Sequence, residues 1–185
     1  LVQLTRVFSM VQSIAARMYV FLDIDFYGKL QEKKDKSKKS KEQRRKSLSE
    51  TLRNASLNAT NDADQTGPVG AVADESEAEY IVTLMEEGAL NEGCFLGSFI
   101  PHLITVLKNP KDFPSPKLQQ QATVSLISLM LISNSLYEEQ IAFIFTILER
   151  STDELQRCCI ITYIPDLCKS FPNSFDPWTA KVYEV

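Results

Sequence analysis

The sequence has few of the residues from which catalytic and metal sites are usually built. It contains one histidine, His102, and four cysteines without a Cys-x-x-Cys pair: Cys94, Cys158, Cys159 and Cys168. A zinc site needs about four soft ligands at short spacings, so we expect free, buried thiols that fill the core and a structural His102. No Gly-rich phosphate loop or nucleophile motif is present, so no catalytic, cofactor or small-molecule site is expected.

Glycine and long apolar stretches are also scarce. Only 6 of the 185 residues are glycine, and alternating β-branched patterns are rare, which favours helices. No apolar stretch approaches the roughly 20 residues of a membrane-spanning helix, and no signal peptide is visible, so no membrane association is expected. The chain begins with Leu1 rather than Met, which we interpret as a fragment or processed product.

Positive charge is concentrated in one stretch. The formal net charge is -4, but residues 29–53 contain 11 Lys/Arg and 4 Asp/Glu, a net of +7, which leaves -11 for the remainder. Residues 31–67 contain few apolar side chains to offset the entropy of ordering. They are therefore predicted to form a disordered basic and polar linker.

Both flanks of this linker have the apolar periodicity of helices. Residues 1–30 are predicted to form one helix of the fold, because apolar side chains recur at alternating spacings of three and four. A coiled coil is the alternative interpretation of that stripe. Residues 68–185 are predicted to form helical repeats, in which Pro101 either kinks a helix or marks its start.

Helix-start signals recur at regular distances in this last region. Four are present: Ser115-Pro116, Ser135 with Glu138, Ser151 with Glu154, and Asp176-Pro177. Alternate signals are 36 and 41 residues apart, close to the period of two-helix HEAT units. Two corresponding helices also open alike, with Leu118-Gln119 and Leu155-Gln156. The predicted fold is all-α, a HEAT-repeat α-solenoid of antiparallel helix pairs with a disordered basic linker.

Several motifs after the linker resemble a known family. They are Val69-Gly70-Ala71-Val72-Ala73-Asp74, Glu77-Ala78-Glu79-Tyr80-Ile81, Phe145-Thr146-Ile147-Leu148-Glu149-Arg150-Ser151, and Phe171-Pro172-Asn173 followed by Asp176-Pro177-Trp178-Thr179. In order and spacing these motifs resemble the first non-SMC subunits of condensin, which are HEAT-repeat proteins. The Phe-Pro-Asn and Pro-Trp-Thr pattern is more similar to condensin I than to condensin II.

The resemblance implies a non-catalytic scaffold in mitotic chromosome condensation. It implies binding to kleisin and SMC ATPase subunits and sequence-independent contact with double-stranded DNA, whereas ATP hydrolysis belongs to the SMC subunits. It also implies a nuclear and chromosomal location with a cytoplasmic pool, and no cofactor. An alternative is a peptide-binding HEAT or armadillo scaffold of nuclear transport or phosphatase assembly.

The basic tract is the main candidate functional segment. Its cations could neutralise DNA phosphates, serve as a nuclear-import signal, or only keep a linker solvated. They are Lys33, Lys34, Lys36, Lys38, Lys39, Lys41, Arg44, Arg45 and Lys46. Two serines are candidate phosphorylation sites: Ser47, which follows the Arg-Arg-Lys triplet, and Ser115, which precedes a proline and is also a candidate helix N-cap.

The last family motif contributes a second group of candidates. It contains Phe171, Pro172, Asp176, Pro177 and Trp178. The two aromatic residues could anchor a partner peptide, because aromatic side chains dominate interface energetics. Alternatively, they fill the seam between adjacent helices, which their position at helix boundaries favours.

Overall fold

The computed structural model describes residues 1–22, 28, 32, 35, 36, 39, 83, 88–91 and 93–184. The chain divides into two units, one made of Leu1–Val20 with Leu84–Val185 and the other of Phe21–Thr83. Among the described residues the regular structure is helical without a strand, so the predicted all-α class is confirmed. The boundaries at 30, 31–67 and 68 depend largely on residues outside the described ones, and they stay predictions.

Five longer helices form the described part of the first unit. They are α1 (Val2–Val20), α4 (Ile100–Lys108), α5 (Pro116–Met130), α6 (Asn134–Arg150) and α7 (Glu154–Ser170). The shorter elements are η2 (Gly97–Phe99), α8 (Pro172–Phe175), η3 (Asp176–Trp178) and α9 (Thr179–Glu184). Helices α4 and α6 begin 34 residues apart, and α5 and α7 begin 38 residues apart. The expected recurrence of helix pairs is therefore present.

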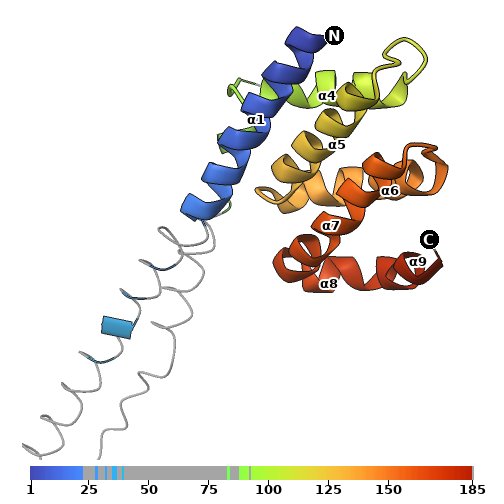
Figure 1. Cartoon of the computed structure of the whole chain (residues 1–185). Coiled ribbons are helices and arrows are strands. Elements are labelled where there is room, and N and C mark those ends of the chain that lie inside the picture. Colours follow the sequence, from blue (N-terminus) through green and yellow to red (C-terminus); the bar gives the residue numbers. More distant parts are fainter. Residues whose placement is uncertain are drawn as a thin grey trace, which may run out of the picture. The chain divides into compact units, whose positions relative to one another are not determined.

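These helices lie in two rows (Figure 1). Helix α5 contacts both α1 and α7, and the three form one row. In the other row, Lys108 Nζ at the end of α4 lies 5.7 Å from the centre of the Phe143 ring on α6. Further along α6, the Phe145 ring contacts those of Phe175 and Trp178. The α8–α9 segment therefore continues the row of α4 and α6.

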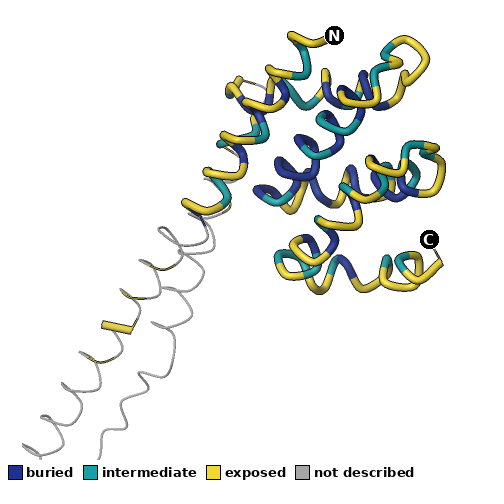
Figure 2. Tube along the Cα trace, in the orientation of Figure 1, coloured by how far each residue is buried: buried dark blue, intermediate teal, exposed yellow. Residues whose placement is uncertain are grey.

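Helix α5 is the centre of the first unit. It packs against α1, α4, α6 and α7, and Figure 2 shows it as the most continuously buried helix. Among the described residues, the largest fully buried side chains are Phe8, Leu103, Leu118, Leu126, Ile127, Leu129, Met130, Ile132, Tyr137, Ile144, Phe145 and Leu148. Because full burial of one such apolar side chain contributes about 1.5–3 kcal/mol, packing around α5 is a main source of stability.

Helix α1 belongs to this core although residues 21–83 separate it from the later helices. Its Phe8 and Ala15 side chains are fully buried. Ser125 Oγ of α5 donates a hydrogen bond to the carbonyl oxygen of Phe8 at 2.9 Å. Gln121 Nε2 donates to Gln12 Oε1 at 2.8 Å. Helix α1 therefore packs on α5 through apolar and polar contacts, although residues 21–83 separate it from the later helices in the sequence.

Two helices begin at residues other than the predicted caps. Helix α6 begins after Ser133 rather than Ser135, because the backbone is still extended at Ser133 and its Oγ accepts a first-turn N–H at 3.4 Å. Helix α7 begins after Asp153, whose Oδ1 accepts the Leu155 N–H at 3.2 Å. Ser151, the predicted cap, instead ends α6.

Prolines mark the remaining helix starts. Pro101 lies in the first turn of α4, so it marks a start and does not kink the helix. Ser115 occupies the N-cap position of α5 and Pro116 is its first residue, as expected. Near the C-terminus, however, the first helical turn begins at Pro172, and Asp176 opens the 3₁₀ turn that follows it.

Candidate interaction surfaces

The cysteines and the histidine form no cluster in the described part of the chain. No group of three or more His, Cys, Asp or Glu side chains there could hold a metal ion. The four thiols are free. The expectation that they are buried is wrong: Cys158 is exposed, and Cys94, Cys159 and Cys168 are half-buried. The reason in α7 is that its described neighbours cover only one of its sides. His102 is exposed on α4.

None of the described helices is both long enough and apolar enough to cross a bilayer.

Two cations of the basic tract are described. Lys36 and Lys39 are both helical and exposed. Lys36 Nζ lies 2.7 Å from Glu32 Oε1, four residues earlier, and both side chains are largely in solvent. Such exposed pairs contribute little free energy, about 0.3–0.5 kcal/mol, so Lys36 remains able to contact another anion. The other candidate cations and Ser47 lie outside the described residues: Lys33, Lys34, Lys38, Lys41, Arg44, Arg45 and Lys46.

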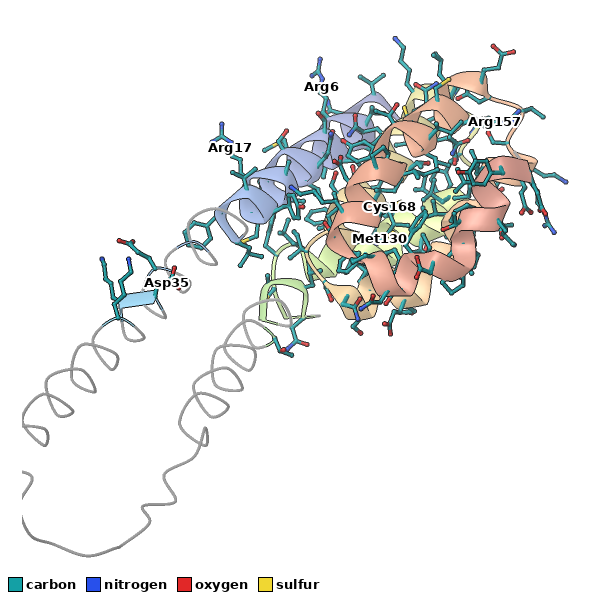
Figure 3. The ribbon with its side chains drawn as sticks, turned by 90° about the horizontal axis from the view of Figure 1, so that it is seen from below. Arg6, Arg17, Asp35, Met130, Arg157 and Cys168 are labelled. Carbon is teal, nitrogen blue, oxygen red and sulfur yellow. The ribbon has the colours of Figure 1, made fainter. Side chains whose placement is uncertain are left out.

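A second cationic surface lies on α1. Arg6 and Arg17 point away from the other helices (Figure 3), and the segment Val2–Val20 contains no acidic residue. Met10 and Ile14 are exposed between them. The outer face of α1 is therefore both basic and apolar.

Ser115 is half-buried at the start of α5. Its side chain makes no capping hydrogen bond. Its carbonyl oxygen accepts the N–H groups of Leu118 and Gln119, each at 3.0 Å. The helix start therefore depends on the backbone of Ser115, and its hydroxyl is not engaged in the cap.

The candidate aromatic residues near the C-terminus face α6. The ring of Phe171 stacks on Tyr137 at a centroid distance of 4.6 Å, and Trp178 stacks on Phe145 at 4.9 Å. Lys181 Nζ lies 5.3 Å from the centre of the Trp178 ring. Both aromatic residues therefore lie in a seam between helices. Their neighbours in the motif are exposed: Pro172, Asp176 and Pro177.

Tyr137 is deeply buried in this seam. Its side chain is 1% exposed, and its hydroxyl has no hydrogen-bond partner among the described residues. Burial, followed by the nearby Cys168 and Glu138, raises the pKa of Tyr137 from 10.0 to about 12. The hydroxyl therefore stays neutral at physiological pH, and Tyr137 acts as a packing residue.

A hollow of about 460 Å³, here called the loop hollow, lies between the loop after α4 and the loop after α6. Both loops lie at the same edge of the helical array (Figure 1). Its lining combines apolar and aromatic side chains with polar ones, and it includes both cations and an acidic residue. The lining includes Leu107, Phe113, Phe143 and Ile147 together with the charged residues Lys108, Arg150 and Asp153.

Two buried glutamines also line the loop hollow and hold its loops in place. Gln119 Nε2 donates to the carbonyl oxygens of Val106 and Phe113, both at 3.0 Å. Gln156 Oε1 accepts from Ser151 Oγ at 2.7 Å. The sequence signal for this arrangement is the repeated Leu-Gln pair, which by itself indicates only a repeat. No sequence motif indicated the hollow.

No family model matches the sequence, but individual proteins do. Condensin complex subunit 1 of Homo sapiens is 34% identical over 142 residues, which cover 77% of this chain and 10% of the human protein. The Mus musculus protein of the same name is 35% identical over 114 residues, 62% of this chain and 8% of that protein. Condensin-1 complex subunit CAP-D2 of Arabidopsis thaliana is 26% identical over 186 residues, 98% of this chain and 13% of that protein.

The chain thus spans about a tenth of the length of these curated relatives. Similar proteins of Xenopus laevis and Saccharomyces cerevisiae have the same name as the human one. These matches confirm the resemblance that the sequence motifs indicated. The chain belongs to the condensin complex subunit 1 family.

Proposed function

We propose that this chain is a non-catalytic, HEAT-type scaffold segment of a condensin complex. The observation that carries the proposal is the similarity to condensin subunits, which extends over up to 98% of the chain. A scaffold role suits the described array, where buried polar side chains such as Gln119 and Gln156 position loops. The proposal involves no cofactor and no small-molecule substrate.

In this role the helical array binds kleisin and SMC ATPase subunits, and the SMC subunits hydrolyse ATP. The complex acts in mitotic chromosome condensation, in the nucleus and on chromosomes, with a cytoplasmic pool. The names of the relatives support this assignment, because each is a subunit of a condensin complex. A scaffold of nuclear transport or phosphatase assembly is the alternative, but the five relatives named above are all condensin subunits.

Copurification tests the assignment. The tagged chain is expressed in dividing cells, and its partners are identified by mass spectrometry. Kleisin and SMC subunits are the expected partners. Recovery of transport cargo or phosphatase subunits in their place would overturn the proposal, as would recovery of neither condensin component.

The second part of the proposal is that the basic tract contacts DNA phosphates. Residues 29–53 carry a net +7, and the described Lys36 and Lys39 are exposed. Each phosphate contact on duplex DNA releases counterions, which makes log K fall with log salt concentration by about 0.9. A tract that makes several such contacts therefore gives a steep salt dependence without sequence preference.

A salt series with duplex DNA tests the tract. The intact chain is compared with a variant in which residues 31–53 are replaced by a Gly/Ser linker of the same length. The expected result is weaker binding and a salt slope that is shallower by several units. Unchanged DNA binding would exclude a DNA role for the tract. If the variant lost nuclear import while DNA binding stayed intact, the tract would be assigned to import.

Phosphorylation of Ser47 would regulate this contact, because a phosphate adds about -1.5 to -2 charges beside three cations. Treatment with a basophilic kinase is expected to weaken DNA binding of the wild-type chain and to leave Ser47→Ala unchanged. Equal weakening of DNA binding in the wild-type chain and in Ser47→Ala would exclude Ser47 as the regulatory site.

Phosphate on Ser115 would lie at the positive end of α5, so the helix should tolerate it. Mass spectrometry of mitotic protein tests both sites.

A further inference from the structure

The outer face of α1 is uncovered over about three helical turns. Its exposed side chains follow one another at spacings of four, four and three residues, which places them on one side of the helix. They are Arg6, Met10, Ile14 and Arg17. The two arginines lie roughly 16 Å apart along the helix axis and point away from the other helices (Figure 3). The fully buried Phe8 lies on the opposite side, where α1 packs on α5.

The two arginines of this face have no carboxylate to neutralise them. Both are exposed, and neither has a hydrogen bond or an ion pair within the part of the chain that the structure describes. The helix itself, Val2–Val20, contains no acidic residue. Both guanidinium groups are therefore available to an anionic group of a partner, and their planar donor geometry suits a carboxylate or a phosphate.

The surface between the two arginines is suited to apolar contact. Met10 is 62% exposed and Ile14 is 38% exposed. Together with Ser9, Ser13 and Arg17 they line a hollow of about 300 Å³ on this face. Ser13 Oγ donates a hydrogen bond to the carbonyl oxygen of Ser9 at 2.8 Å. Because this hydroxyl is satisfied within its own helix, a partner can cover it at little cost.

This combination of charged and apolar side chains favours a protein helix over DNA. Phosphates would pair with the arginines, but they offer no apolar surface to Met10 and Ile14, and α1 contains no lysine. At protein–protein interfaces Met and Arg are enriched, whereas Lys is depleted. An amphipathic helix can place a ridge of apolar side chains beside small residues such as Ser9 and Ser13. It can also present acidic residues at both ends of the contact.

We propose that the outer face of α1 binds an amphipathic helix of a partner protein. Apolar side chains of that helix pack on Met10 and Ile14, and acidic residues near the two ends of the contact pair with Arg6 and Arg17. A contact of this length is small, so weak and reversible binding is expected. The interaction goes beyond the scaffold assignment, and it can be measured on the purified chain without other condensin subunits.

Fluorescence anisotropy tests the proposal with a labelled helical peptide of about 18 residues. Its Ala/Gln sequence carries Glu, Leu, Leu and Glu at spacings of four, four and three, which match the spacings on α1. The variant Arg6→Glu/Arg17→Glu is expected to bind this peptide about tenfold more weakly, because two attractions become repulsions. Met10→Gln/Ile14→Gln should bind at least about fivefold more weakly, since the apolar contact is lost.

A matched control and a reversed peptide sharpen this test. The control is Lys108→Glu/Arg150→Glu, which makes the same charge change at exposed positions on α4 and α6, in the other row of helices. It should bind within about twofold of the wild type, because distant charges are screened. A peptide with lysine in place of each glutamate should bind the wild type weakly. It should bind Arg6→Glu/Arg17→Glu about as well as the acidic peptide binds the wild type.

Several results would overturn the proposal. They are no binding by the wild-type chain up to about 1 mM peptide, equal weakening by the control variant, unchanged binding by Met10→Gln/Ile14→Gln, and no recovery of binding with the lysine peptide. Displacement of the peptide by a short DNA duplex, with DNA binding that depends on Arg6 and Arg17, would assign the face to nucleic acid instead. Circular dichroism and thermal melts of each variant verify the fold.

Discussion

Helices α5 and α7 correspond to each other but differ in their surroundings. From Lys117 onward, each residue of α5 has a counterpart 37 residues later in α7, as the pairs Leu118-Gln119 and Leu155-Gln156 illustrate. One face is buried in both helices. In α5 it contains Gln119, Thr123, Ile127 and Met130, and in α7 it contains Gln156, Ile160, Ile164 and Leu167.

The other face is buried only in α5. Its residues Leu118, Ala122, Ser125 and Leu129 are each 0% exposed. Their counterparts in α7 are Leu155, which is 63% exposed, the half-buried Cys159, and the exposed Thr162 and Asp166. Two helices with the same opening residues therefore have different burial.

Helix α1 accounts for this difference. The four α5 residues share one helical face by their spacing, and Ser125 donates to the Phe8 carbonyl of α1. Helix α7 carries Asp166 where α5 carries Leu129, so its open face does not reproduce the surface that α1 covers. A segment that precedes a long insertion thus determines which of two similar helices is central.

The largest effect on stability is expected at Leu129 and Asp166, a pair of corresponding positions, one fully buried and the other exposed. Leu129→Asp places a carboxylate at a fully buried position without a partner, which should cost more than about 4 kcal/mol and abolish cooperative folding. Asp166→Leu, at the exposed counterpart, should change the free energy of unfolding by less than about 0.5 kcal/mol. Circular dichroism with urea denaturation measures both. A folded, stable Leu129→Asp chain would refute the packing of α1 on this face.

Truncation of the corresponding leucines should give the next largest difference. Leu118→Ala removes fully buried atoms and leaves a cavity, which should cost about 3 kcal/mol. Leu155→Ala should cost less than about 0.5 kcal/mol because its side chain is mostly in solvent. The measurement is the urea midpoint at two protein concentrations. An equal loss at Leu155 would contradict the exposed position of this side chain.

A smaller difference is expected from the hydroxyl groups on the same faces. Ser125→Ala loses the bond to the Phe8 carbonyl, which should cost about 1 kcal/mol. Thr162→Ala loses only a bond to the Cys158 carbonyl of its own helix, on an exposed surface. Because alanine has the higher helix propensity, this change should leave stability unchanged or slightly increased. Thermal unfolding of the two variants in parallel measures the difference, and a larger loss at Thr162 would contradict the comparison.

The helices themselves were predictable because their causes are local. Apolar side chains at spacings of three and four, prolines in first turns and a recurring Leu-Gln pair all act within a few residues. The exact caps were less predictable. Ser133, Asn134 and Ser135 all compete near one helix start, and the backbone conformation of Ser133 decides among them. Near the next start, Asp153 replaces Ser151 because Ser151 already terminates α6.

The interaction surfaces were less predictable because they combine distant segments. Nothing local indicates that Phe8 lies against Ser125, or that Gln119 holds the loop that contains Phe113. For the same reason the cysteines of α7 were wrongly expected to be buried: their apolar surroundings in the sequence suggested a core, but the described helices leave that side uncovered. The basic tract is a property of composition, and its role stays a prediction.

The last test compares the burial of corresponding positions in α5 and α7 through the reactivity of cysteine thiols. Ala122→Cys introduces a thiol at the fully buried counterpart of Cys159. It adds one heavy atom to a packed site, which should cost about 1 kcal/mol or somewhat more. With iodoacetamide, the exposed Cys158 should react first. Cys159 should react more slowly, because burial, and then Cys158 and Asp153, raise its pKa and lower the fraction of the reactive thiolate. Its rate should therefore increase with pH up to that raised pKa.

The thiol introduced at position 122 should stay unreactive in the native chain and become reactive in urea as the protein unfolds. Mass spectrometry of peptides from a time course separates position 122 from the two native sites, and fragment ions separate the adjacent Cys158 and Cys159. The control is the same variant with Phe8→Ala, which weakens the packing of α1 because Phe8 is fully buried. In that background the introduced thiol should become reactive at a lower urea concentration. If it reacted as quickly as Cys158 in the native chain, α1 would not protect α5, and the contrast between α5 and α7 would have another cause.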